Sequence, residues 1–475
     1  MHCRQKLAWR AAVAAVAAVL VVCTVANRAA AQDVTSYTRE TFYEWLRKYR
    51  DAKPDFKPGE VLSWKDVERM RPFVIPGYLE QMNFPEFKME IIATQDHTPR
   101  KDYMECTEKY QSQVRLASDG ALDNYVCGQP FPDSALSVDD PQSGLKAAWN
   151  FEYRWQYYGL WTALWQPIWV RFGGSHGAVA KNTALAPENW LAPVTVTTKI
   201  PDDNSDIYGG GGTFQRILNS YYQRTYYTHL AQVPGHTLPL PHADEFEYKE
   251  FTGFFSPFDI RGTAFIVFRY SDPHRADDAW AYIPTLRRVR RISAEVKSDS
   301  LLGTDHTIED FYGFAGRVLE WKWRFLGWKD LLCVQDSKHT YSTFYGPNGM
   351  IPDDVWSVRR FAVIERTPTF PRHPYSAVLN FFDAQNWDSW WEVALDRKGK
   401  LWKEWEYMKK WSETYKEWAE INNGLHITTF QSVDVLDLQN QRGTLGVSIG
   451  IGYPTPKLKE TEQLFDINKL EEIHR

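Results

Sequence analysis

Long apolar runs are scarce in this chain of 475 residues, and after the first 31 residues none reaches the ~20 residues that a membrane-spanning helix needs. The nearest stretch, Trp155 to Val170, is uncharged but is interrupted by Pro167 and by polar residues. The chain also lacks Gly/Ser-rich or Pro-rich linkers, low-complexity segments and clear internal repeats. We therefore expect one domain over residues 32–475, without a membrane span.

The first 31 residues contain no acidic residue. They begin with Arg4, Lys6 and Arg10, continue with an apolar run from Ala11 to Ala26, and end on three alanines at Ala31. This order predicts a secretory signal peptide that is cleaved after Ala31. A lipoprotein signal ending at Cys23 is a weaker interpretation, because the residue before an acylated cysteine should be small and Val22 stands there.

Cations are in the minority, and the formal net charge is −5. Removal of the signal peptide would take away four cations and leave a net charge of −9. An acidic, exported chain is a poor match for nucleic acid, whose binding depends on cations. We expect a periplasmic protein with no nucleic-acid partner.

Cysteine is also scarce, and only Cys106, Cys127 and Cys333 would remain in the mature chain. An oxidising compartment favours a bridge from Cys106 to Cys127, which would close a loop of about twenty residues and add roughly 3 kcal/mol of stability. Cys333 would then be a buried free thiol. Three reduced core cysteines are the alternative, and spacing alone leaves it open.

Aromatic residues are abundant, at 15% of the chain, and hydrophobic alternation favours strands. The N-terminal third predicts helices from Thr38 to about Arg50, from Thr98 to about Val114 and from Lys146 to Trp155. After about Leu191 the hydrophobic period changes to two. The predicted strands cover 263–270, 277–283, 286–293, 318–325, 389–396, 401–408, 427–438 and 445–451. Short turns such as the one at Gly399 predict an α+β fold with a mostly antiparallel sheet.

Two motifs invite a chemical interpretation. Gly173 to Gly177 matches the G-x-S-x-G turn that presents a nucleophilic serine, here Ser175, beside His176 as a base. Glycines with serine and histidine also form ordinary loops, and we favour that interpretation. Asp202 to Asp206 has the alternating oxygens of a calcium loop but lacks its glycine and its bidentate glutamate. We therefore expect no catalytic residue, metal or cofactor.

The stretch from Trp155 to Val170 also carries Trp161, Trp165 and Trp169. We favour a core segment, because large aromatic side chains normally fill the interior of a domain. The alternative is a lid or wall of a cavity that contacts an apolar ligand.

The segment from Leu286 to Ser293 contains four arginines in an acidic protein. In a strand, one face would carry Arg287, Val289 and Arg291, and the other would carry Arg288, Arg290 and Ile292. Cations would therefore lie on both faces. We favour ion pairs with acidic neighbours. The sharper hypothesis is contact with an anionic lipid headgroup or an acidic partner. The residues concerned are Arg287, Arg288, Arg290 and Arg291.

Several motifs in sequence order resemble a bacterial family usually labelled outer-membrane lipoprotein-sorting protein, a domain of unknown function related to the periplasmic carriers LolA and LolB. The motifs are Asn124–Pro132, Ser256–Gly262, Asp277–Pro284 with Arg287–Arg291, Val363–Glu365 with His373–Tyr375, and Asp396–Lys400. The resemblance implies a curved antiparallel sheet that half-closes around an apolar cavity, with helices as plug or lid. It also implies cooperation with an RND-type permease and an outer-membrane protein. Cys127 and Trp387–Trp391 depart from the commoner pattern.

Our leading hypothesis is a carrier or chaperone for a lipid, a lipoprotein acyl group or another apolar molecule, without covalent chemistry. The alternatives are a serine hydrolase that uses Ser175 and a glycan-binding envelope protein, because tryptophan faces also stack on sugars. The candidate cavity wall consists of Phe265, Trp321, Trp323, Trp391 and Trp405.

Overall fold

The computed structural model describes residues 34–154, 159–173, 211–292, 298–339, 342–414, 424–452 and 457–470. Its helices are α2 (Arg39–Lys48), α3 (Val67–Met70), α4 (Tyr78–Gln81), α5 (Lys101–Tyr110), α6 (Ser143–Glu152) and α8 (Leu458–Leu464). Short 3-10 segments that matter below are η9 (Leu301–Gly303), η10 (Ile308–Gly313), η11 (Val318–Glu320) and η13 (Ile467–Lys469).

The described residues contain twenty strands. They are β1 (Val61–Ser63), β2 (Lys88–Ile91), β3 (Arg115–Leu116), β4 (Leu122–Asp123), β5 (Leu160–Arg171), β6 (Thr213–Ile217), β7 (Asn219–Tyr226), β8 (Phe246–Ser256), β9 (Ala264–Tyr270), β10 (Asp278–Ile283), β11 (Arg288–Ile292), β12 (Trp321–Cys333), β13 (Phe344–Tyr345), β14 (Ile351–Pro352), β15 (Val355–Pro368), β16 (Tyr375–Asp383), β17 (Ser389–Asp396), β18 (Leu401–Trp411), β19 (Thr428–Asp437) and β20 (Arg442–Gly452).

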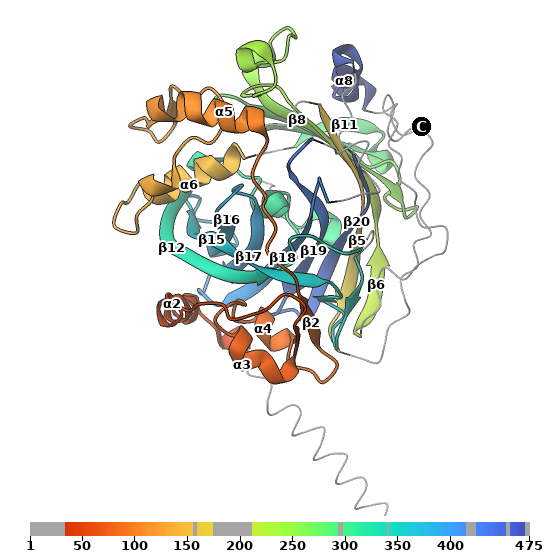
Figure 1. Cartoon of the computed structure of the whole chain (residues 1–475). Helices are drawn as coiled ribbons and strands as arrows, with labels where there is room; N and C mark the ends of the chain where they lie inside the picture. Colours follow the sequence, from red (N-terminus) through yellow and green to blue (C-terminus); the bar gives the residue numbers. More distant parts are fainter. Residues whose placement is uncertain are drawn as a thin grey trace, which may run out of the picture.

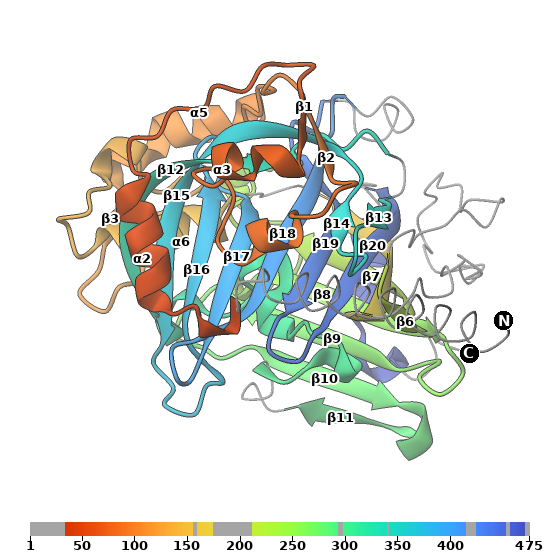
Figure 2. The same ribbon diagram turned by 90° about the horizontal axis from the view of Figure 1, so that it is seen from below.

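Sixteen of these strands form one sheet, in the order β1-β2-β15-β16-β17-β18-β19-β20-β5-β7-β8-β9-β10-β11. Strand β12 pairs with β15 and β6 pairs with β5 at the sides of this path. Only the contact of β2 with β15 is parallel among the described pairs. The predicted α+β fold with a mostly antiparallel sheet is therefore confirmed, and Figures 1 and 2 show the strands curling around an interior.

Two adjacent residues of η10 demonstrate how strongly the sheet curves. The main-chain oxygen of Gly313 accepts a hydrogen bond of 2.8 Å from Asn380 Nδ2 on β16. The ring of Tyr312 lies 5.8 Å from the ring of Tyr222 on β7. Six interstrand steps separate β16 from β7, which would span about 29 Å in a flat sheet. One short segment can reach both strands only because it lies inside the curve.

The outer face of the sheet is covered at two places. Helices α2, α3 and α4 pack on β15 to β18 through a large apolar core, for example where the Tyr78 ring meets the Trp391 ring edge-on at 4.8 Å. Farther along the sheet, Phe465 and Leu470 of the C-terminal segment pack on the outer residues of β5, β7, β8 and β9. The sheet is thus shielded from outside while its inner face surrounds η9, η10 and η11.

The sequence predicted many of these elements with shifted ends. The helix predicted from Thr38 begins with Thr38 as its N-cap residue, and the hairpin of β17 and β18 turns through Gly399 at φ +74°. Helix α5 begins at Lys101 rather than after Thr98, because Arg100 is the extended N-cap residue. The change to strands near Leu191 was placed too late, since β5 begins at Leu160.

Two predictions on single segments need correction. The strand expected over 318–325 begins only at Trp321, after a 3-10 turn, and continues to Cys333. Arg287 is not on a strand face, because it adopts a left-handed conformation with φ 49° in the turn before β11. Within the described residues, no helix is long and apolar enough to cross a membrane. The predicted signal peptide lies outside the described residues.

Candidate ligand cavity

Strand β5 builds one wall of an interior cavity. Alternation directs Trp161, Ala163 and Trp165 inward, while Leu160 and Leu164 point outward into the core beneath the C-terminal segment. The neighbouring strand β7 is antiparallel to β5 and pairs Tyr222 with Ala163, which places that tyrosine on the same inner face. A run of aromatic residues at every second position therefore becomes a continuous aromatic surface.

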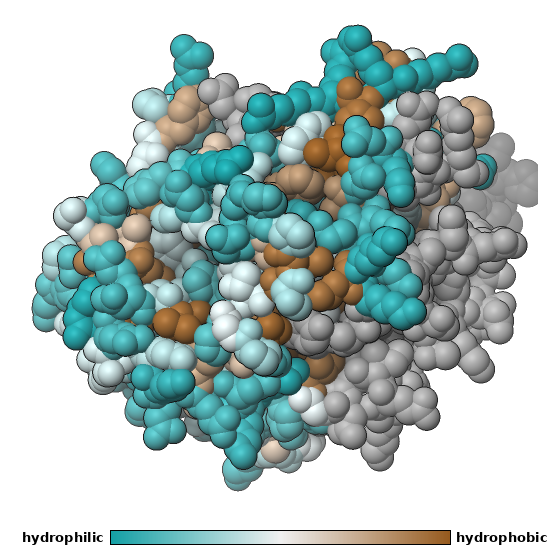
Figure 3. Space-filling model, turned by 90° about the horizontal axis from the view of Figure 1, so that it is seen from above, coloured by the Kyte–Doolittle hydropathy of each residue, from teal (hydrophilic) through white to brown (hydrophobic). Residues whose placement is uncertain are grey.

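The cavity lies between this wall, the η10 segment and the inner faces of β18 and β19. About 490 Å³ of empty space lies between these elements, part of it open solvent, and about 40 Å³ of it is accessible to a water-sized sphere. Its lining consists of Trp161, Ala163, Trp165, Tyr222, His306, Phe311, Tyr312, Tyr407, Phe430 and Val433. Most of these side chains are buried. By contrast, Figure 3 shows a mainly hydrophilic outer surface with separate apolar patches.

Buried polar groups fasten the η10 segment over the cavity. Asp310 accepts a hydrogen bond of 2.8 Å from the hydroxyl of Tyr375 on β16. The hydroxyl of Tyr407 on β18 donates to the main-chain oxygen of Asp310 at 2.8 Å. Glu309 and the ring of His373 are 2.8 Å apart at Nε2. We call the η10 segment the roof of the cavity. These bonds hold the roof to β16 and β18, so that Phe311 and Tyr312 remain against the cavity.

Burial alone would raise the pKa of Glu309, but the hydrogen bond to His373 and the charge of Arg366 lower it below its usual range. Glu392 lies deeper beside the same arginine, and burial raises the pKa of Glu392 well above its usual range. Glu309 therefore favours the ionised form, whereas its neighbour Glu392 on β17 favours the protonated form.

A paired arginine closes one end of the aromatic surface. The guanidinium of Arg224 binds Glu250 at 2.7 Å, and its Cζ lies 4.0 Å from the centroid of the Tyr248 ring and 4.9 Å from that of Tyr312. Glu250 also accepts a hydrogen bond of 2.5 Å from Tyr222. This cation is neutralised by Glu250 and packed between tyrosine rings.

His306 is a cavity residue with an unusual environment. Burial, together with the nearby charge of Lys403, lowers the pKa of His306 to about 3. Its Nδ1 accepts a hydrogen bond of 3.4 Å from Trp405 Nε1. The imidazole is therefore neutral near pH 7.

Three of the five predicted wall residues lie beside the cavity or the η10 segment that covers it. Trp405 stands directly behind His306, and Phe265 joins the apolar cluster that includes Trp161 and Trp165. Trp321 donates to Glu309 at 3.0 Å and so supports the roof. These three border the cavity or its roof without being among its lining residues.

The other two predicted wall residues lie farther away. Trp323 packs edge-on against Phe314 at 5.0 Å and donates to the main-chain oxygen of Val318. Trp391 lies on the outer face against Tyr78, with its Nε1 donating to the oxygen of Leu332 at 3.0 Å. Neither contacts the cavity.

The alternative interpretation of the 155–170 stretch as a cavity wall fits the lining better, since Trp161 and Trp165 belong to it. Trp169 lies outside the lining, and Trp155 lies outside the described residues. Sequence reasoning missed the contribution of His306, Phe311 and Tyr312. Their segment has no hydrophobic period, so only an aromatic pair beside acids could have drawn attention to it.

The arginine-rich strand β11 ends the described sheet. Arg291 forms an ion pair with Asp278 of β10, which confirms the ion-pair interpretation for this residue. Arg287, Arg288 and Arg290 are exposed and have no ion-pair partner among the described residues. Figure 2 shows β11 at the free edge of the strand series.

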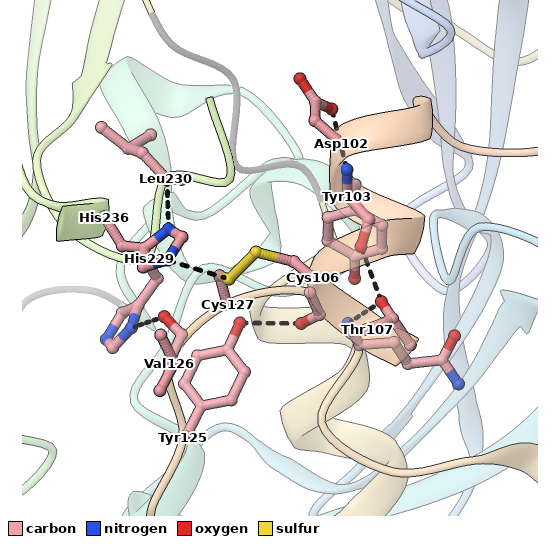
Figure 4. Close-up of a disulfide and its surroundings, with 12 residues drawn as sticks. Asp102, Tyr103, Cys106, Thr107, Tyr125, Val126, Cys127, His229, Leu230 and His236 are labelled. Atoms are coloured by element: carbon pink, nitrogen blue, oxygen red, sulfur yellow. Dashed lines mark hydrogen bonds between the residues drawn. A yellow bond between two sulfur atoms is a disulfide. The ribbon is translucent and has the colours of Figure 1, made fainter. Parts of the chain in front are cut away.

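The predicted bridge between Cys106 and Cys127 is present, with the two Cα atoms 5.6 Å apart. It joins α5 to the segment that carries Tyr125 and Val126 (Figure 4). Nε2 of the half-buried His236 lies 4.0 Å from Cys127 Sγ, so this histidine packs beside the bridge. Cys333 is free and buried, as predicted. Ser175, His176 and the loop at 202–206 lie outside the described residues.

The fold and the cavity define an α+β protein whose curved antiparallel sheet surrounds an aromatic pocket roofed by an irregular segment. The chain matches the family DUF1329, described as a protein of unknown function, over residues 63–210 and 207–450. These matches cover most of the chain, which therefore belongs to this family, and the family resemblance seen in the sequence is confirmed.

Solved structures with a related chain include a Vibrio parahaemolyticus domain named for outer membrane lipoprotein sorting, at 18% identity and a TM-score of 0.42, over 70% of this chain and all (100%) of the other. A DUF1329 protein from Desulfovibrio piger matches at 16% identity and a TM-score of 0.43, over 70% of this chain and 99% of the other. A LolA superfamily protein from Nitrosomonas europaea matches at 12% identity and a TM-score of 0.32, over 63% of this chain and 89% of the other. No curated protein matches the chain.

Proposed function

We propose that this protein is a periplasmic carrier or chaperone that binds a lipid, a lipoprotein acyl group or another apolar molecule in the cavity and passes it across the envelope. An RND-type permease would deliver the cargo and an outer-membrane protein would receive it. The protein would act by burial and release, without covalent chemistry.

The observation that carries this proposal is the aromatic cavity inside the curve of the sheet. Trp161, Ala163 and Trp165 pack with other aromatic side chains and also present apolar surface to the cavity. Covering apolar ligand surface there is favourable by ~25 cal/mol per Å². The roof is a separate segment fastened by side chains, an arrangement that suits entry and exit of cargo.

Mass spectrometry of lipids extracted from the purified protein tests the proposal directly. We expect a bound apolar molecule and uptake of a fluorescent fatty-acyl probe. An empty protein that takes up no probe contradicts the carrier, and binding to peptidoglycan or polysaccharide without lipid uptake would favour a glycan-binding protein instead.

Filling the cavity links binding to this site. Ala163→Phe should reduce probe binding at least tenfold, because the new ring occupies the space beside Tyr222. Ala279→Phe is the matched control, since it adds the same ring on β10, where the residue is half-buried and outside the cavity. Equal binding by both variants would place the cargo elsewhere.

The non-enzymatic part of the proposal has its own test. Ser175→Ala should leave probe binding unchanged, and the wild-type protein should hydrolyse no acyl ester. Ester hydrolysis that disappears in this variant would establish the hydrolase alternative.

We further propose that the edge at β11 contacts the anionic headgroups of a membrane during cargo transfer. The β10–β11 turn and the β8–β9 turn lie at the same end of the sheet, because Tyr282 pairs with Ala264. Phe258 is 92% exposed at one turn and Leu286 is 45% exposed at the other. Exposed apolar tips beside exposed guanidinium groups are suited to a lipid surface of negative charge.

Sedimentation with vesicles separates this contact from simple stability effects. Arg288→Ala with Arg290→Ala should weaken binding to vesicles containing phosphatidylglycerol several-fold and leave cargo loading intact. Arg397→Ala with Lys398→Ala removes the same charge from the exposed β17–β18 turn and should have little effect. Loss of stability with unchanged vesicle binding would support a structural role, and binding only to an acidic protein would replace the membrane.

A further inference from the structure

Two donor groups in the cavity lining have no partner. The indole Nε1 of Trp165 and the Nε2 of His306 are buried and form no hydrogen bond within the described part of the chain. By contrast, the Tyr222 hydroxyl donates to Glu250 and the Tyr407 hydroxyl donates to the main-chain oxygen of Asp310. Buried polar groups are normally satisfied, so unsatisfied ones in a cavity point to a ligand.

The hydrogen bond behind His306 determines which ring nitrogen carries the proton. An indole N–H can only donate, so the bond from Trp405 Nε1 makes His306 Nδ1 an acceptor. The neutral ring then carries its single proton on Nε2, the nitrogen without a partner. His306 therefore offers a donor, just as Trp165 does.

The two donors belong to one part of the cavity. The ring of Phe311 packs edge-on against Trp165 at 5.7 Å and lies 5.6 Å from the ring of His306. All three side chains line the same space. Both donor side chains therefore pack against the same ring of the η10 segment.

We infer that the cargo bound in this cavity carries a neutral hydrogen-bond acceptor, a ketone, ester or amide carbonyl, on an apolar body, and that Trp165 Nε1 and His306 Nε2 donate to it. The inference rests on the proposed function and adds the chemical class of the cargo. A carbonyl oxygen has two lone pairs and can accept from both donors.

A carboxylate fits this site less well than a neutral carbonyl. Arg224, the cation near the Tyr312 side of the cavity, is occupied by Glu250. Lys403 near His306 donates to the main-chain oxygen of Asp305 at 2.7 Å. Neither Arg224 nor Lys403 is among the lining residues, so a carboxylate in the cavity would lose its hydration without a direct ion pair. The cavity should therefore bind a ligand with a neutral acceptor more tightly than a ligand with a carboxylate.

The test compares three ligands of equal chain length by displacement of a fluorescent naphthylamine probe from the full-length mature protein. We expect 2-decanone to bind at least tenfold more tightly than decane, and decanoate to bind more weakly than the ketone at pH 7.5. Tenfold corresponds to about 1.4 kcal/mol. Equal binding of decane and 2-decanone would overturn the inference and leave the carrier intact, whereas no binding of either would count against the carrier itself.

Variants assign the effect to the donors. Trp165→Phe keeps an aromatic ring and removes the N–H, so the preference for 2-decanone over decane should fall about tenfold while decane binding changes little. Trp169→Phe is the control, because Trp169 lies on the same face of β5, also has an unpartnered Nε1, and is outside the lining. His306→Phe should lower the same preference. An equal loss for both ligands in Trp165→Phe would reduce that residue to packing and overturn its role as a donor.

Discussion

Strand β18 separates two buried environments of different chemistry. On its inner face, Trp405 and Tyr407 have engaged polar atoms, which donate to His306 and to the main-chain oxygen of Asp310. On its outer face, beneath α4, stand Glu404 and Glu406. Alternation along one strand thus places aromatic donors beside the cavity and carboxyl groups in the opposite core.

The outer face holds more acid than its partners can neutralise. The Tyr78 hydroxyl lies 2.8 Å from Glu406 and 2.5 Å from Asp434. Neither carboxyl oxygen of Glu404 has a partner among the described residues. Burial raises the pKa of Glu404 well above its usual range, and the nearby Glu80 and Asp434 add to this. These carboxyl groups favour the protonated form.

The two faces should therefore respond to pH in opposite directions. His306 has a pKa of about 3 in the folded chain, so its contribution to stability is complete above its unfolded value near 6.5 and declines as the pH falls. Glu404 has a raised pKa, so its contribution is complete below about pH 4.5 and declines as the pH rises. The inner face of β18 should therefore lose stability as the pH falls, and its outer face should lose stability as the pH rises.

The largest effect should come from removing the ring that joins the inner face to His306. Trp405 is fully buried, and Trp405→Ala should cost about 3–5 kcal/mol of unfolding free energy. Chemical denaturation at pH 7.5 measures it. Trp402→Ala, at a partly exposed position of the same strand, should cost less. Equal losses would mean that the inner face is no better packed than the strand end.

The pH response of the inner face provides a second test. His306→Gln cannot titrate, so its stability should fall less than that of the wild type between pH 7 and pH 4, by roughly 2–4 kcal/mol. The free energy of unfolding is measured across this range. His242→Gln, at an exposed histidine, is the control. Parallel curves for His306→Gln and the wild type would contradict the buried neutral imidazole.

The outer face should show a smaller effect of opposite sign. Glu404→Gln is uncharged at every pH, so it should stabilise the protein by about 1–3 kcal/mol at pH 8 and by little at pH 4. Thermal unfolding at both pH values measures the difference, with exposed Glu44→Gln as the control. A destabilised variant at pH 8 would show that Glu404 is ionised and engaged in the folded state.

Much of the fold could be predicted because local patterns carry it. The β17–β18 hairpin follows from two alternating segments around Gly399. The predicted signal peptide favoured the bridge of Cys106 with Cys127, although spacing alone left three reduced cysteines open. The role of Arg287 could not be predicted, because alternation continues through a turn that only its φ of 49° reveals.

The cavity was harder to predict than the strands. Trp321, Trp391 and Trp161 have the same alternating surroundings in the sequence, yet they support the roof, fill the outer core and line the cavity, respectively. Their different roles depend on which neighbouring elements cover each face. Helix α4 covers Trp391, whereas the η10 segment contacts both Trp321 and Trp161.

The sequence by itself determined which residues share a face of each strand, since a strand's period of two is a local property of the backbone. It also determined the charge at β11 and the family. Only the tertiary structure decided which face is the inside, because curvature arises from pairing along the whole sheet. The same curvature brings Tyr312, His306 and Trp165 together from separate segments, and so creates the cavity.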